Sequence, residues 1–174
     1  MVCFATIWLS FTSFCSAQGY HQLTNDDFRG NIGNISMGVI ANTNCTIDFK
    51  YVAHQQNGYY RLDFDIRLVL NNNKSWIDRR RVTSAEMLNQ ILKHEQGHYT
   101  VAFMEQQELI RTVSRTVFHE DYQSEARRIF NRIDAKYKQL NLDYDAATRH
   151  MLNREQQQSW DAYFEKQLEF MPPG

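Results

Sequence analysis

The sequence predicts an α+β domain in which an N-terminal antiparallel sheet is followed by three helices. In the first half of the chain, short runs alternate between apolar and polar residues and are rich in aromatic and branched side chains. After residue 83, apolar residues recur instead at three- and four-residue steps, the order expected when the sheet and helices are segregated. With 174 residues, 43% of them hydrophobic, the chain suits one domain with a substantial core.

Three segments of the first half predict strands, and they cover residues 37–42, 46–53 and 59–70. Apolar side chains occupy every second position of the last segment, at Leu62, Phe64, Ile66 and Leu68. The pair Asn57-Gly58 separates the second segment from the third and is typical of a tight turn. We therefore expect these two strands to form a hairpin, and the asparagines at 71–73 to end the sheet.

Three periodic segments of the second half predict helices, at about residues 84–117, 122–140 and 153–170. Thr83 or Ser84 can cap the first helix, and Asn153 can cap the third. One stripe of the first helix carries apolar residues and two histidines, namely Met87, Ile91, His94, His98 and Ala102. Because this stripe is apolar, we expect both histidines to face the interior.

Charge composition argues against a nucleic-acid partner. The chain has 19 Lys and Arg residues against 20 Asp and Glu residues, so its net charge is close to zero. The sequence has no long basic run and no basic patch interleaved with aromatic residues. We therefore expect no nucleic acid among its main partners.

The first 17 residues are apolar and uncharged, and they predict a secretory signal peptide. Cys15-Ser16-Ala17 approximates a small-residue cleavage site, so the mature domain is expected to span residues 18–174. No second hydrophobic span follows. The sequence therefore predicts a secreted or periplasmic protein that has no integral membrane span after signal cleavage and keeps Cys45 as its one cysteine. The alternative is that the N-terminal segment is not cleaved and anchors the chain.

The most informative motif is His94-Glu95-Gln96-Gly97-His98 within the first predicted helix. On a helix, His94 and His98 lie one turn apart on one face, so both imidazoles can bind one zinc ion while Glu95 lies beside them. The alternative is a pair of buried histidines without a metal. Gly97 would cost about 1 kcal/mol relative to Ala in mid-helix, a cost that a close approach to the helix would explain.

Catalytic zinc usually has three protein ligands and keeps a further position for water, so another ligand is needed. His150 lies in a polar segment between two predicted helices and could turn back toward the first. Glu120 and Cys45 are the other candidates, the first as a downstream carboxylate and the second as an upstream thiolate. Residue types and spacing alone leave these three alternatives open.

The sequence resembles a bacterial family known as domain of unknown function 922, whose members are expected to be secreted zinc-dependent peptidases. Three blocks carry the resemblance: LTNDDFRG at 23–30, KSW at 74–76 with LKHEQGHY at 92–99, and 144–150 followed by Gln157 and Trp160. The chain departs from the family pattern at Asn25, where the family has Trp, and at Met151, where it has Gly. The resemblance implies a zincin-like fold, with His150 as the third ligand and with Tyr144 and Asp145 close to the metal.

These observations together predict an extracytoplasmic hydrolase with one zinc ion per chain, and a peptide or protein as its substrate. Glu95 would act as the general base on a zinc-activated water. Because they neighbour His150, Tyr144 is our first choice and Arg149 our second for the donor to the oxyanion, and Asp145 would accept a ring N–H of a ligand histidine. An exposed edge strand, such as 59–70, would align the peptide.

Two alternative functions remain at this stage. A zinc hydrolase could cleave a non-protein amide, in the cell wall or in a small acylated substrate. The domain could instead be a secreted α+β binding module without catalytic activity, in which case a bound metal would have four protein ligands.

Overall fold

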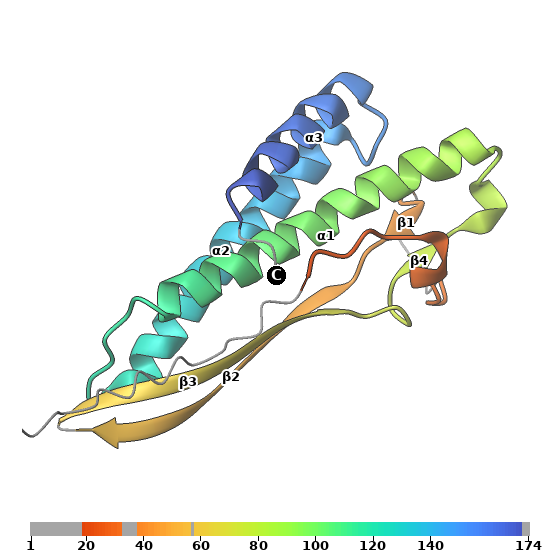
Figure 1. Cartoon of the computed structure of the whole chain (residues 1–174). Helices are drawn as coiled ribbons and strands as arrows, with labels where there is room; N and C mark the ends of the chain where they lie inside the picture. Colours follow the sequence, from red (N-terminus) through yellow and green to blue (C-terminus); the bar gives the residue numbers. More distant parts are fainter. Residues whose placement is uncertain (1–18, 33–37, 57, 172–174) are drawn as a thin grey trace, which may run out of the picture.

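The computed structural model describes residues 19–32, 38–56 and 58–171. Their arrangement is α+β, with strands in the first half and three helices in the second (Figure 1). The predicted signal peptide, residues 1–17, lies outside the described residues. Within the described ranges, no helix is both long enough and apolar enough to cross a bilayer.

The predicted hairpin is confirmed. Strands β2 (Cys45–Gln56) and β3 (Tyr59–Leu70) pair antiparallel from Cys45↔Leu70 to Gln56↔Tyr59. Their inward side chains pack against the helices, at Ile47, Phe49, Tyr51, Leu62, Phe64 and Ile66. The opposite face carries charged side chains, which alternate along each strand with the apolar ones. Gly58, in the turn between the two strands, has a φ of +84°. The alternation of apolar and polar residues along each strand therefore leaves one face of the hairpin buried and the other exposed to solvent.

The expected single sheet is wrong, because the strands form two separate antiparallel pairs. The second pair joins β1 (Ala41–Asn42) to β4 (Trp76–Ile77). The pairing continues at Ile40, whose carbonyl oxygen accepts from the Asp78 N–H at 2.8 Å. Strand β1 thus covers two of the residues predicted as strand in 37–42, and residue 37 lies outside the described residues.

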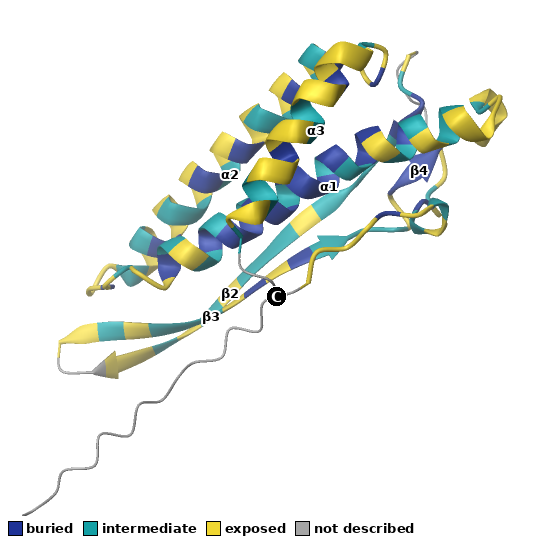
Figure 2. Cartoon of the chain, turned by 45° about the horizontal axis from the view of Figure 1, so that its top comes forward, coloured by how far each residue is buried: buried dark blue, intermediate teal, exposed yellow. Residues whose placement is uncertain are grey.

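Helix α1 (Ala85–Val113) runs through the middle of the molecule and separates two apolar cores (Figure 2). Ser84, and not Thr83, is its cap, with its hydroxyl accepting from the Met87 N–H at 3.1 Å. The hairpin, α2 (Tyr122–Thr148) and α3 (Arg154–Glu169) form one core with it. The N-terminal segment and the β1–β4 pair form the other. Both faces of α1 are covered along much of its length, which explains its many buried residues.

Helix α2 continues eight residues beyond its predicted end at 140, to Thr148. The turn that follows is left-handed at three consecutive residues, with φ values of 49° at Arg149, 49° at His150 and 73° at Met151. Such a conformation costs side-chain-bearing residues roughly 1–2 kcal/mol each. At Met151 it is a conformation that Gly would adopt without this cost.

Arg149→Gly is expected to raise the free energy of unfolding by about 0.5–1 kcal/mol, because Gly ends helices in this conformation without steric cost. Arg149 is exposed, so little packing is lost. Chemical denaturation at equilibrium measures the change. Arg132→Gly, at an exposed position inside α2, is the matched control and should lower stability by about 1 kcal/mol. If Arg149→Gly is no more stable than the unaltered chain, the left-handed conformation at residue 149 is not strained.

Candidate metal centre

Four possible ligand atoms converge between α1 and the end of α2. The Nε2 atoms of His94 and His98 are 3.2 Å apart. An oxygen of Asp145, Oδ1, lies 3.2 Å from each of them and 3.1 Å from Nδ1 of His150. Ligands of a tetrahedral zinc ion at 2.0–2.2 Å would be roughly 3.3–3.6 Å apart. The separation between His94 and His98, and those from Asp145 to the three histidines, are therefore close to the separations between zinc ligands.

Hydrogen bonds orient the two histidines of α1. Nδ1 of His94 lies 3.1 Å from Oε1 of Gln157, and Nδ1 of His98 lies 2.7 Å from Oδ1 of Asn141. An amide oxygen only accepts, so each Nδ1 must carry a proton, which leaves Nε2 as the atom of each ring that can bind a metal. The surrounding protein thus fixes the tautomer that metal binding requires.

Gln157 is held by further contacts. Its Nε2 donates to the Tyr144 hydroxyl at 2.8 Å and to Oδ1 of Asp161 at 2.9 Å. Lys93 pairs with the other oxygen of Asp161 at 2.7 Å. Because the amide nitrogen is engaged in this way, the amide oxygen of Gln157 must face His94. This chain of contacts links α3 to the face of α1 that carries His94.

Glu95 is almost fully buried, with 3% of its surface exposed, and it lies on the side of α1 that faces the residues after β1. The Thr43 hydroxyl donates to its Oε2 at 2.7 Å. An atom of Glu95 lies within 4.8 Å of ligand atoms of His94 and His98. The carboxylate is therefore held beside the two histidines, as a general base would need to be.

The centre is electronegative. Burial lowers the pKa of His98, but the hydrogen bond to Asp145 and the charges of Glu95 and Asp145 outweigh it and raise that pKa to about 9. Burial likewise raises the pKa of Asp145, and hydrogen bonds from His94 and His98 reverse this, so that the pKa lies well below its usual range. The negative potential that favours an imidazolium also favours a divalent cation.

Tyr144 does not lie where an oxyanion donor would be expected. Its fully buried hydroxyl donates to the backbone oxygen of His94 at 3.0 Å, and its ring stacks on the His94 ring at 4.8 Å. The proton is therefore engaged in the structure that supports α1. Arg149, our second choice, is exposed in the left-handed turn.

Of the three candidates for the third ligand, the structure brings His150 to the cluster. Glu120 is exposed in the connection after α1, whose end at Val113 lies roughly 22 Å beyond His98 along the helix axis. Cys45 lies near enough to Glu95 to feel its charge, but burial first and this charge second raise the pKa of its thiol to about 12. Among the described residues, Cys45 belongs to neither group of side chains that could hold a metal ion, so it is not brought to the cluster.

The sequence analysis does not identify Asn141. It predicts that Asp145 accepts a hydrogen bond from a ligand histidine, and it does not predict that its carboxylate oxygen lies among the possible ligand atoms. The sequence predicts that this helix ends at 140, whereas α2 has about two more turns and ends at Thr148. Asn141 and Asp145 are four residues apart on one face of a helix, as His94 and His98 are on α1. That shared spacing is the signal that could have identified them.

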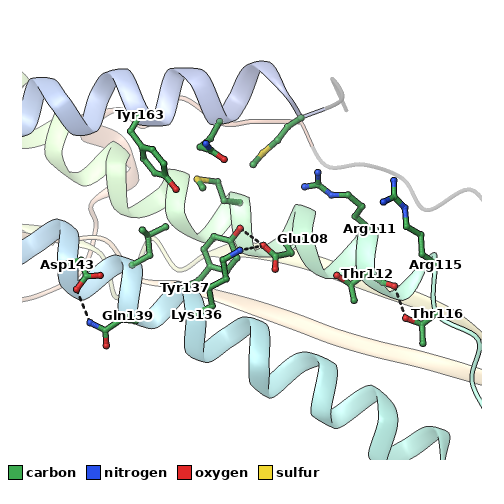
Figure 3. Close-up of a pocket in the computed structure, with 14 residues that line it drawn as sticks. Glu108, Arg111, Thr112, Arg115, Thr116, Lys136, Tyr137, Gln139, Asp143 and Tyr163 are labelled. Carbon is green, nitrogen blue, oxygen red and sulfur yellow. Dashed lines mark hydrogen bonds and ion pairs between the residues drawn. The ribbon is translucent and has the colours of Figure 1, made fainter.

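A cavity of about 170 Å³ opens beside this cluster, between α1, the last turns of α2 and residues 39–43. A larger groove, of about 710 Å³, lies farther along α1, between α1, α2 and α3 (Figure 3). There Glu108 pairs with Lys136 at 2.5 Å and accepts from Tyr137 at 2.9 Å, so its charge is compensated. No histidine lines that groove among the described residues, and the smaller cavity is the better candidate for chemistry.

Comparison with known families gives a match over residues 18–151 to the family described as "Bacterial protein of unknown function (DUF922)". The chain belongs to this family. Within this DUF922 protein the match covers α1, α2 and the left-handed turn, and hence the four converging residues. Searches of the curated proteins and of the solved structures found no match.

Proposed function

We propose that this protein is an extracytoplasmic zinc-dependent hydrolase that cleaves amide bonds, with a peptide or protein as substrate. One observation carries the proposal: a ring nitrogen of each of His94, His98 and His150 lies within 3.2 Å of the same Asp145 oxygen. Glu95 lies beside His94 and His98. These residues fit zinc because imidazoles are among its preferred ligands and the ring nitrogens are already oriented. A bound zinc ion would supply Lewis acidity toward water and toward a substrate carbonyl.

The residues of the chain supply the remaining parts of this chemistry. Glu95 would take a proton from the attacking water and return it to the leaving amine, and Thr43 would hold the carboxylate in place for both transfers. Asn141 and Gln157 would keep the histidines in the required tautomer. Tyr144 would act as a positioning residue beneath His94, which revises its expected role as an oxyanion donor.

The position of β1 supports a peptide substrate. Because Ile40 bonds to Asp78 across the pair, the N–H and C=O of Ala41 point away from β4. Residues 39–43 line the cavity, and β1 has no second neighbouring strand among the described residues. An extended backbone could pair with this edge next to Glu95. The strand edge proposed to bind the peptide is therefore that of β1, which lines the cavity, and not that of the segment 59–70, which does not.

Metal content tests the centre itself. Mass spectrometry of the metal-loaded full chain should find about one zinc per molecule, and His94→Ala and His150→Ala should each lose it. His54→Ala, at an exposed histidine of the hairpin, is the control and should keep it. Absence of zinc from the unaltered protein would favour the binding-module alternative. Zinc lost with His94→Ala but not with His150→Ala would remove His150 from the ligand set.

Substrate class is tested separately. The zinc-loaded protein is offered a library of peptides and, in parallel, fragments of peptidoglycan. Cleavage of peptides that stops on chelation and resumes with added zinc is the expected result. Cleavage of cell-wall amides alone would favour the other hydrolase reading.

A further inference from the structure

We propose that Asp145 is itself a metal ligand and that its carboxylate closes the centre in the resting protein. The inference rests on the proposed function for the presence of a metal, and it concerns how that site is regulated. A catalytic zinc site keeps one position for water or substrate, whereas four protein ligands close a site. A substrate would then have to displace the carboxylate, and the protein would be latent until it does.

The position of Asp145 relative to the rings distinguishes a ligand from a residue that only orients a ligand. An orienting residue bonds the ring nitrogen that faces away from the metal, and Gln157 and Asn141 already occupy those positions on His94 and His98. Asp145 instead faces Nε2 of both rings, at 3.2 Å in each case. Those are the two atoms left for the ion, so the carboxylate lies on the metal side.

The same oxygen also reaches the third histidine. Oδ1 of Asp145 is 3.1 Å from Nδ1 of His150, so one oxygen lies within 3.2 Å of a nitrogen on each of the three rings. Within the described residues, all the ion pairs of Asp145 are with these histidines and none is with Lys or Arg. Among the described residues, the three histidines are therefore the groups that position this carboxylate.

The location of Asp145 also allows the carboxylate to leave. Its side chain is 25% exposed, so water reaches it, and it comes from the last turn of α2. The backbone of that turn is fixed separately, because the Asp145 carbonyl oxygen accepts from the N–H groups of Arg149 and His150. Rotation of a short side chain can therefore open the centre while α2 and the three histidines stay in place. Zinc can also expand to five ligands during such an exchange.

A cobalt-substituted full chain tests the inference without relying on activity. Visible absorption of bound Co²⁺ reports its ligand set, and acetohydroxamate is the probe of an open position. With cobalt in excess, Asp145→Ala should change the spectrum and bind acetohydroxamate at least about tenfold more tightly than the unaltered protein. Asp145→Asn should fall between the two, because an amide is a weaker ligand than a carboxylate. Asp143→Ala, which removes an exposed carboxylate from the same helix, should behave as the unaltered protein.

Asn141→Ala distinguishes a ligand from a positioning residue. It removes the partner of His98 on the side away from the metal, so it should weaken cobalt binding and leave the spectrum of the bound ion unchanged. If Asp145→Ala gives this same result, with acetohydroxamate affinity unaltered, Asp145 is not a ligand and the inference is overturned. If the unaltered protein binds neither cobalt nor zinc, the proposed function is overturned instead. The two failures are distinguishable because the first requires that the unaltered protein binds cobalt.

Discussion

Glu95→Gln is expected to lower the rate of amide hydrolysis by about 10²- to 10⁴-fold while leaving the zinc content unchanged. Gln has the shape of Glu and can still accept a hydrogen bond from Thr43, which reaches the carboxylate at 2.7 Å. It cannot take a proton from water. The loss should therefore appear in kcat, because the interaction that disappears is made in the transition state.

The measurement compares kcat, KM and metal content on the best substrate from the peptide library. Glu86→Gln, in the exposed first turn of the same helix, controls for the loss of one negative charge and should retain full activity. Hydrolysis by the Glu95 variant at the unaltered rate would exclude Glu95 as the general base. Loss of zinc together with activity would show that the carboxylate supports the metal, and the variant would then not report on catalysis.

Gly97→Ala is expected to destabilise the protein by about 1–3 kcal/mol and to displace His94, on which the Tyr144 ring stacks. Helix propensity alone predicts the opposite, a gain of about 1 kcal/mol. A Cβ at this position would meet the Tyr144 hydroxyl and would lie 2.7 Å from Cε1 of its ring. The ring is fully buried and stacks on His94, so it cannot move aside without disturbing the centre.

Chemical denaturation and zinc titration measure the two effects of Gly97→Ala. A double-mutant cycle with Tyr144→Leu provides the control, because the smaller side chain removes the ring that the new methyl group meets. We expect the double variant to be more stable than the sum of the two single changes predicts, by at least about 0.5 kcal/mol. Additive effects would show that the close approach of Tyr144 is not the reason for Gly97.

Local patterns were sufficient for the elements that depend on neighbouring residues. The alternation at Leu62, Phe64 and Ile66 and the turn at Gly58 predicted the β2–β3 hairpin, because strand period and turn chemistry are local properties. Asn153 caps α3 as its side chain and position predicted. The helical spacing of His94 and His98 likewise placed both rings on one face of α1.

Local patterns failed where polar residues are buried by partners distant in the sequence. Tyr144 and Thr148 continue the buried face of α2 beyond Tyr137. Polar residues lie among them, at Asn141, Asp143 and Asp145, so the sequence predicts a polar connection there. Tyr144 is accommodated there because its hydroxyl bonds α1 and α3, which no local pattern contains. The pairing of β1 with β4 was missed for the same reason, since two residues per strand give no period.

The sequence by itself determined the α+β class, the hairpin, and the pair of histidines with Glu95 between them, because each follows from spacing along one element. Tertiary structure alone decided which distant residues complete the centre. His150 reaches it through a left-handed turn, and Asp145 lies beside Nε2 of His94 and His98 because α2 continues past its predicted end. The packing of α2 against α1 sets the distances between these groups, and spacing along the chain does not encode that packing.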